Sequence, residues 1–198
     1  MAEPAIAVAV LAAGSSQRFG ARDKLAQSLH GAALGEHAVR AIPRDDFAKA
    51  WVIASQAGHA CEPAWRANGF EVAVNDSAHA GMGTSLALAA AFAGEAGCSG
   101  LLIALADMPF VPRRHFRSLR ARFAQGAPIA VSATHDVRMP PAIFDAAHFD
   151  DLQRGRGDQG ARAFLRDGVI VPCPVQWLID IDTPAALEQA ERRPPSTA

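Results

Sequence analysis

Short apolar runs alternate along this chain with segments in which apolar residues recur at helical spacing. Five of the runs predict buried strands, at residues 5–10, 50–54, 70–74, 100–106 and 128–133. Helices are predicted between and after them, at residues 32–42, 60–67, 86–93, 112–123 and 159–166. Because parallel strands covered on both faces are apolar throughout, we expect an α/β fold: a three-layer α/β/α, Rossmann-like arrangement with a mostly parallel central sheet.

The C-terminal part shows a different pattern. Apolar and acidic residues alternate over residues 178–182, which predicts one more strand with Asp180 and Asp182 on the same side. Thr183 followed by Pro184 predicts the N-cap and the first residue of a last helix. Asp182 would then lie at a corner between a strand and a helix.

Length and composition agree with one domain. With 198 residues, 50% of them hydrophobic and 20% charged, the chain is long enough to bury a core without disulfides or metal ions. We expect residues 1–191 to form that domain and residues 192–198 to be a disordered tail. The formal net charge of −1 gives no general attraction to nucleic acid or to a membrane surface, so we expect neither as a partner.

Neither the cysteines nor the N-terminus point to an oxidising compartment. The three cysteines, Cys61, Cys98 and Cys173, are odd in number and far apart, which argues against a disulfide framework and against zinc ligation. The N-terminal apolar run carries Glu3 and lacks a basic start, and no run approaches the roughly 18 apolar residues that cross a bilayer. The expected location is therefore cytoplasmic.

The first predicted strand leads directly into a glycine-containing loop that carries three cations. Gly14 and Gly20 can adopt positive φ and let ligand oxygens approach the backbone. Main-chain N–H groups and nearby cations bind anions, so we interpret the segment as a nucleotide-phosphate loop. The alternative is an ordinary strand-to-helix turn with solvated cations, and the spacing matches neither a P-loop nor G-x-G-x-x-G. The candidate binding residues are Leu11, Ala12, Ala13, Gly14, Ser15 and Ser16, and the cations are Arg18, Arg22 and Lys24.

A second polar segment follows the third predicted strand. Its small and hydroxyl residues stand at the start of an alanine-rich helix, where they offer spare donors to an anion or a base edge. A plain N-cap, which would need only Thr84 or Ser85, is the alternative. The candidate binding residues here are Gly81, Gly83, Thr84 and Ser85.

The most apolar of the runs, at residues 100–106, leads straight into Asp107. A carboxylate at the carboxyl end of a central parallel strand lies where open α/β sheets bind ligands. Mg²⁺ takes one or two protein carboxylates and completes its shell with water and phosphate oxygens. Asp107 and Asp182 could supply those carboxylates, with Asp180 as the reserve ligand. The alternative for Asp107 is a turn or cap residue before Pro109.

Together these stretches resemble a known family. Residues 11–24 are similar to the L-A-A-G-x-S-x-R-x-G-x-x-K signature of the nucleotidyltransferase superfamily that includes the molybdenum cofactor guanylyl- and cytidylyltransferases, with one extra residue before Lys24. The resemblance is weakest between residues 124 and 144, where Met139 stands in place of the histidine of a G-H-P motif. Further similar blocks are N-x-x-x-x-x-G-M-G-x-S-L at residues 75–86, D-M-P at 107–109, G-D-x-G-A-R at 157–162 and D-I-D-T-P at 180–184.

The resemblance implies a nucleotidyltransferase fold and a Mg²⁺-dependent reaction. A phosphate on the acceptor would attack the α-phosphorus of a nucleoside triphosphate, and pyrophosphate would leave. Since a phosphate monoester is largely dianionic at neutral pH, no general base is needed. Arg18, Lys24 and Asp107 would be the catalytic residues, with Lys24 on the triphosphate oxygens.

The cytidylyltransferase branch is the better match, because residues 11–14 read Leu-Ala-Ala-Gly where the guanylyl branch more often has L-A-G-G. This branch implies CTP and molybdopterin cofactor as substrates, and a molybdoenzyme as recipient of the product. Three alternatives stay open. They are a GTP-using guanylyltransferase, transfer to another phosphorylated metabolite, and a non-catalytic module that delivers a nucleotide or a cofactor.

Overall fold

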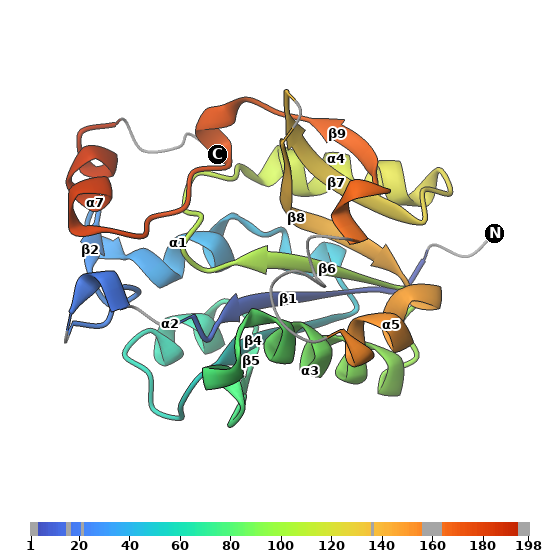
Figure 1. Ribbon diagram of the computed structural model, residues 1–198, viewed down its shortest axis with the longest axis horizontal. Coiled ribbons are helices and arrows are strands. Elements are labelled where there is room, and N and C mark those ends of the chain that lie inside the picture. The colour runs from blue at the N-terminus through green and yellow to red at the C-terminus, as the bar shows by residue number, and fades with distance from the viewer. Residues whose placement is uncertain (1–3, 15–16, 21, 136, 156–163, 194–198) are drawn as a thin grey trace.

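A mixed sheet of seven strands runs through the centre of the molecule (Figure 1). The computed structural model describes residues 4–14, 17–20, 22–135, 137–155 and 164–193. The strand order is β5-β4-β1-β6-β8-β7-β9, and only β8 runs antiparallel to its two neighbours. The expected mostly parallel sheet is therefore confirmed. The strands are β1 (Ile6–Ala12), β4 (Lys49–Ala54), β5 (Glu71–Val74), β6 (Gly100–Leu105), β7 (Ile129–Thr134), β8 (Val137–Asp145) and β9 (Val169–Pro172).

Helices cover both faces of this sheet, as the three-layer expectation requires. Alternate side chains of β1 enter two separate apolar cores, because successive strand residues point to opposite faces. One core is completed by α1, α2, α4 and α7, and the other by α3 and α5, which lie side by side (Figure 1). The helices are α1 (Leu34–Ala41), α2 (Glu62–Ala67), α3 (Met82–Glu95), α4 (Arg113–Ala124), α5 (Phe149–Arg154) and α7 (Pro184–Glu191).

The order of the strands places a ligand-binding edge beside β1. The chain runs from β1 outward to β4 and β5, and α3 then carries it back to β6 on the other side of β1. Both neighbours are parallel to β1, with Ala12 opposite Ala54 and Leu11 opposite Leu105. The carboxyl ends of these strands thus share one edge, and the strand order reverses between β1 and β6. Open α/β sheets bind ligands at such a point.

The strand predicted at residues 178–182 is wrong. These residues form no strand; they follow a short 3₁₀ helix, η5 (Val175–Trp177), and precede α7. Leu178 and Ile181 are buried in the core while Asp180 is exposed, so the alternation reflects one-sided burial without ladder pairing. The capping prediction beside it is confirmed, because the Thr183 side chain accepts a hydrogen bond from the Ala186 N–H, 3.1 Å away.

Two strands of the central sheet, β8 and β9, were not predicted. The edge strand β9 is four residues long and only its Val171 is buried, so it carries little apolar signal. The antiparallel strand β8 contains Pro140 and Pro141, joined by a cis peptide bond. Both prolines fall at a register irregularity opposite the Val131/Ser132 step, where the missing N–H groups break no ladder bond.

Smaller departures occur at the boundaries of the predicted helices. The helix expected at residues 32–42 begins at Leu34, because Ala32–Ala33 form strand β3 of a small hairpin with β2 (Ser28–Leu29). The helix expected at residues 86–93 begins four residues earlier, at Met82. Of the helix predicted at 159–166, only residues 164–166 are described, and they are helical. No helix formed by the described residues is both long and apolar enough to cross a membrane.

Candidate active site

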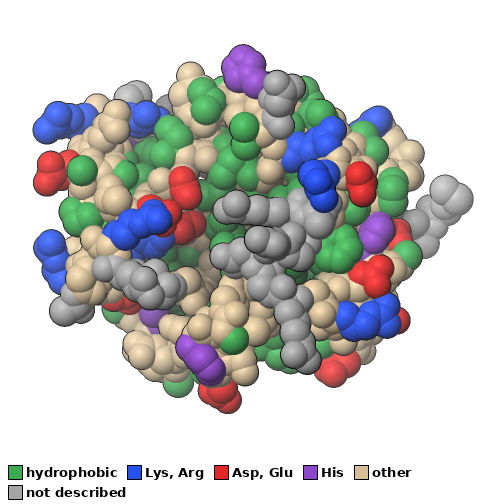
Figure 2. Space-filling view, in the orientation of Figure 1, with side chains coloured by type: hydrophobic (Ala, Val, Ile, Leu, Met, Phe, Trp, Pro, Cys, Tyr) green, Lys and Arg blue, Asp and Glu red, His purple; other side chains and the backbone are tan. Residues whose placement is uncertain are grey.

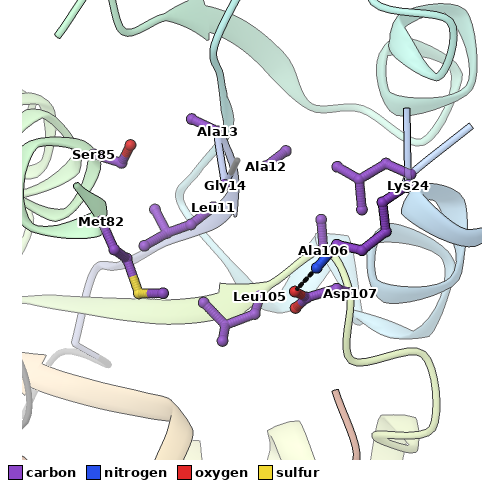
Figure 3. Close-up of a pocket in the computed structure, with 11 residues that line it drawn as sticks. Leu11, Ala12, Ala13, Gly14, Lys24, Met82, Ser85, Leu105, Ala106 and Asp107 are labelled. Carbon is purple, nitrogen blue, oxygen red and sulfur yellow. Dashed lines mark hydrogen bonds and ion pairs between the residues drawn. The ribbon is translucent and has the colours of Figure 1, made fainter. Parts of the chain in front are cut away.

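A pocket opens at the sheet edge where β1 and β6 end (Figure 3). It encloses about 430 Å³ of empty space, counting the part open to solvent. The strand ends and the start of α3 form its walls, and the Lys24 side chain points toward Asp107 on the side away from Met82 and Ser85 (Figure 3). The lining residues are Leu11, Ala12, Ala13, Gly14, Lys24, Leu25, Met82, Ser85, Leu105, Ala106 and Asp107.

Three charged side chains meet beside this pocket. The Lys24 ammonium donates to Oδ2 of Asp107 at 2.6 Å and to Oδ1 of Asp182 at 2.8 Å. The Lys24 side chain is only 8% exposed. Since both oxygens lie within 2.8 Å of one nitrogen atom, they are within reach of a single cation that bonds oxygen at roughly 2.1 Å. The sequence predicts that Asp107 and Asp182 meet, but it does not predict Lys24 between them, because the family resemblance implies a lysine on the triphosphate.

Asp182 reaches the site by a route that the sequence analysis did not foresee. The backbone N–H of Ile181 donates to the carbonyl of Asp107 at 3.0 Å, which ties the segment before α7 to the end of β6. At its other end α7 is held to the β2–β3 hairpin, where the Glu191 carboxylate accepts a hydrogen bond from the His30 N–H at 2.8 Å. A bridging loop, and not a neighbouring strand, therefore delivers Asp182.

Arg18 adds a second cation on the exposed side of the cluster. Its Nη1 lies 3.2 Å from Oδ2 of Asp182, and its side chain is 71% exposed. Exposed ion pairs of this kind contribute little to stability. Arg18 is thus positioned at the rim, free to change partners. On the face drawn in Figure 2, acidic and basic side chains are interspersed, in line with the formal net charge of −1.

The pKa values of both Lys24 and Asp107 are raised, as the net result of burial and neighbouring charges. Desolvation alone would lower the pKa of Lys24, but the charges and hydrogen bonds of Asp107 and Asp182 outweigh it and raise that pKa. Burial raises the pKa of Asp107, and the neighbouring charge of Lys24 offsets only part of this rise. The Asp182 and Asp180 carboxylates raise it further.

One carboxylate oxygen of Asp107 can still accept a ligand. Its Oδ1 is buried and has no hydrogen-bond partner among the residues that the structure describes. A buried carboxylate oxygen without a partner costs free energy, and such an atom in a native fold is expected to serve a ligand. Among the described residues no group of three or more His, Cys, Asp and Glu side chains converges on one point. The two carboxylates that meet at Lys24 would suit a hard cation that takes two protein oxygens and completes its shell with water and phosphate.

The start of α3 forms the opposite wall of the pocket. Gly81 is its N-cap with φ 110°, a backbone conformation that only glycine adopts readily. Since α3 begins at Met82, Thr84 and Ser85 lie inside its first turn, and neither is the plain N-cap given as the alternative. The hydroxyl of Thr84 donates to the carbonyl of Gly81. Asn75, at the end of β5, donates to the hydroxyl oxygens of Thr84 and Ser85, each at 2.9 Å. This network holds Ser85 in the pocket wall.

Some of the residues predicted to form the site line the pocket, and others lie beside it or away from it. Leu11, Ala12, Ala13, Gly14, Lys24, Ser85 and Asp107 line the pocket. Of the two glycines expected to have positive φ, Gly20 does, at 67°, and Gly14 does not. Arg18 and Asp182 join the site through ion pairs, whereas Asp180 is exposed and acts on Asp107 only through its charge. Ser15, Ser16 and the block at residues 157–162 lie outside the described residues.

Comparison with known proteins places this geometry in a family. A family model described as the MobA-like NTP transferase domain matches residues 8–172, a span that holds both strand ends, Lys24 and Asp107. The chain belongs to the MobA-like NTP transferase domain family. Membership in this NTP transferase family makes it a nucleotidyltransferase that uses a nucleotide substrate.

Individual relatives agree with this assignment. The purine catabolism protein PucB of Bacillus subtilis is 28% identical over 210 residues, which is 97% of this chain and 98% of PucB. The crystal structure of Rv0371c from Mycobacterium tuberculosis has a TM-score of 0.80 at 23% identity and covers 98% of this chain and 100% of its own. Molybdopterin-guanine dinucleotide biosynthesis protein A from Archaeoglobus fulgidus has a TM-score of 0.66 at 23% identity, with 93% and 96% covered. These two structures share the fold.

A divalent metal occurs in one of these relatives. A second crystal structure of Rv0371c, with a TM-score of 0.74 at 23% identity over 93% of this chain and 97% of its own, is a complex with manganese. Divalent metal use therefore has a precedent within the family fold.

Proposed function

We propose that this MobA-like NTP transferase transfers CMP from CTP to the phosphate of molybdopterin cofactor and releases pyrophosphate, with Mg²⁺ as its metal. The observation that carries the proposal is the meeting of Lys24 with Asp107 and Asp182 at a pocket between the ends of β1 and β6. A molybdoenzyme is the proposed recipient of the product. The sequence blocks at residues 11–24 and 75–86 support the cytidylyltransferase branch.

The proposed metal ligands are Asp107 and Asp182, with Asp180 in reserve. Bound there, Mg²⁺ would supply positive charge to the triphosphate and orient it. The buried Oδ1 of Asp107 supports this role, because it has no hydrogen-bond partner within the described part of the chain while Oδ2 is taken by Lys24.

Lys24 and Arg18 are the proposed catalytic cations. Each pairs with a carboxylate of the site and would exchange that partner for phosphate oxygens when a nucleotide enters. They would then stabilise the charge that develops as pyrophosphate leaves. The attacking phosphate needs no base, since its second pKa is near 6. Positioning and charge neutralisation are the work that this set of side chains can do.

The base preference is proposed to depend on Ala13. Ala13 is among the residues that line the pocket. A guanylyltransferase more often has glycine at this position, so the methyl group of Ala13 would narrow the space beside a bound base. A pyrimidine fits a narrower site. CTP is therefore the proposed nucleotide, and GTP is the alternative.

The test is a side-by-side assay of pyrophosphate release with each of the four Mg-NTPs and a molybdopterin preparation. We expect release with CTP, a lower kcat/KM with GTP, and loss of release in Asp107→Asn. A preference for GTP would reverse the base assignment. Transfer only to another phosphorylated acceptor would reject molybdopterin. Nucleotide binding without release under any condition would favour a delivery module over an enzyme.

A further inference from the structure

A buried histidine lies beside the segment that carries Lys24, and the proposed chemistry does not use it. His59 belongs to the loop between β4 and α2, and its side chain is 4% exposed. Its Nε2 lies 2.7 Å from Oδ2 of Asp23, the residue that immediately precedes Lys24. A polar ring buried this deeply needs its hydrogen bonds satisfied, so each of its contacts carries weight.

The contacts of His59 define which nitrogen carries the proton. Its Nδ1 accepts a hydrogen bond from the Cys61 N–H at 3.0 Å, so the ring proton sits on Nε2 and is donated to Asp23. The imidazole also stacks on the indole of Trp65, with ring centroids 4.7 Å apart and planes inclined by 24°. Trp65 is itself fully buried and donates from Nε1 to the carbonyl of Gly35 at 2.8 Å. The ring therefore has one orientation.

Asp23, held by His59, in turn fixes the backbone next to Lys24. Its second carboxylate oxygen, Oδ1, accepts a hydrogen bond from the Leu25 N–H at 2.9 Å. On the far side, the Cys61 thiol donates to the Leu25 carbonyl at 3.3 Å. Burial raises the pKa of Cys61 to about 11, which keeps the sulfur protonated for this role. The residues on both sides of Lys24 are thus anchored to the loop that holds His59.

We propose that His59 and Asp23 form a positioning pair that fixes the Lys24 backbone, so that its ammonium reaches Asp107 and Asp182. His59 touches neither carboxylate and is a positioning residue, not a catalytic one. The inference rests on the proposed function only where its effect on turnover is concerned. Its effect on Lys24 itself can be measured without any substrate.

The amino-acid composition offers a direct readout. The chain has only two lysines, Lys24 and Lys49, and Lys49 is exposed at the start of β4. In the full-length protein, the rates at which an N-hydroxysuccinimide ester acylates the two amines can be followed by peptide mass spectrometry, with Lys49 as internal reference. A Lys24 ammonium held by two carboxylates is expected to react slowly.

Two variants break the pair in different ways. Asp23→Asn keeps the shape of the side chain, but its amide must point a donor either at the His59 Nε2–H or at the Leu25 N–H. His59→Ala removes the ring. Glu62→Gln is the polar control, because Glu62 accepts from the Gly58 N–H in the same loop at 2.9 Å without touching Asp23. Leu119→Ala, in the buried face of α4, is the control for general loss of stability.

We expect Asp23→Asn and His59→Ala to raise the acylation rate of Lys24 relative to Lys49 by about tenfold, the lower end of the effect seen when a hydrogen-bond partner behind a metal ligand is removed. Both controls should leave the ratio unchanged. An unchanged ratio in folded Asp23→Asn would overturn the proposal, and so would an equal rise in Leu119→Ala. If His59→Ala fails to fold, Asp23→Asn decides alone.

Turnover provides the second arm. Asp23→Asn should lower kcat/KM for the nucleotide by about tenfold while Glu62→Gln keeps the value of the wild type. A wild-type protein that releases no pyrophosphate would defeat the proposed function and leave the acylation result standing. Full turnover in Asp23→Asn would show that the pair does not position Lys24 for the reaction.

Discussion

Removal of the Lys24 ammonium should destabilise the fold when no divalent metal is present. In Lys24→Met the chain keeps an unbranched side chain of similar length, but Asp107 and Asp182 lose the cation that lies 2.6 and 2.8 Å from their oxygens. The two carboxylates would then face each other. Asp107 would also have both oxygens without a charged partner, since Oδ1 has none among the described residues.

The magnitude follows from the exposure of the three side chains. Removing one partner of a buried ion pair costs about 3–5 kcal/mol. The Asp182 side chain is 42% exposed, so water screens its attraction to Lys24. The loss of the Lys24–Asp182 pair therefore adds little to the destabilisation. The Lys24 and Asp107 side chains are 8% and 21% exposed, and their pair carries most of the loss. We therefore expect the free energy of unfolding to fall by about 3 kcal/mol, at the lower end of that range.

Urea denaturation in EDTA measures this loss, and Lys49→Met, at the only other lysine, is the matched control. Repeating the titration in excess Mg²⁺ should return part of the lost stability, because a metal bound by the two carboxylates would replace the missing charge. A loss below about 1 kcal/mol in EDTA, the scale of an exposed pair, would refute the reasoning that Lys24 is a buried counter-ion. Equal losses with and without Mg²⁺ would speak against metal binding by this pair.

Three further outcomes are expected. Asp107→Asn and Asp182→Asn should each abolish most pyrophosphate release while both proteins keep a cooperative thermal transition, and wild-type turnover in either would remove that carboxylate from the mechanism. Burial lowers the pKa of His115 from 6.5 to about 4, so wild-type stability should fall as pH drops from 6.5 to 4, by up to about 3 kcal/mol, and His115→Gln should lack this part of the loss in pH-dependent urea titrations. Gly100→Ala would place a methyl carbon 2.7 Å from Cζ of Phe123 and should cost about 1–3 kcal/mol, which Phe123→Leu should largely restore; an additive double mutant would contradict the clash.

The centre of the fold could be predicted from the sequence because its signals are local. All seven residues of β1 and most of β6 are buried, and such continuous apolar runs are typical of parallel strands covered on both faces. Asp107 directly follows one of these runs, so its place at the sheet edge follows from the strand itself. The same reasoning failed at residues 178–182. The apolar residues there alternate with acidic ones because one side of the segment is buried against the core, and the segment pairs with none of the described strands.

The ion pairs of the site could not be predicted in the same way. Lys24 and Asp107 are 83 positions apart, and their contact depends on how the loop after β1 folds back over the edge. The family resemblance implies that the lysine contacts the triphosphate and that the aspartates bind the metal, and it gives no sign that the three side chains pair with one another. His59 offered no signal at all, since a single histidine in a short loop belongs to no motif. The roles of Lys24, Asp107 and Asp182 in the reaction stay predictions.

The loop that brings Asp182 to the site also sets the order in which the site is completed during synthesis. Lys24 meets Asp107 once β1 and β6 have paired, but its second partner lies 158 positions further along the chain and beyond the last strand of the sheet. Because a growing chain emerges and folds from its N-terminus, all seven strands can be present before Asp182 is available. A nascent or C-terminally clipped chain that ends after β9 would thus hold all seven strands of the sheet but only one of the two carboxylates that pair with Lys24.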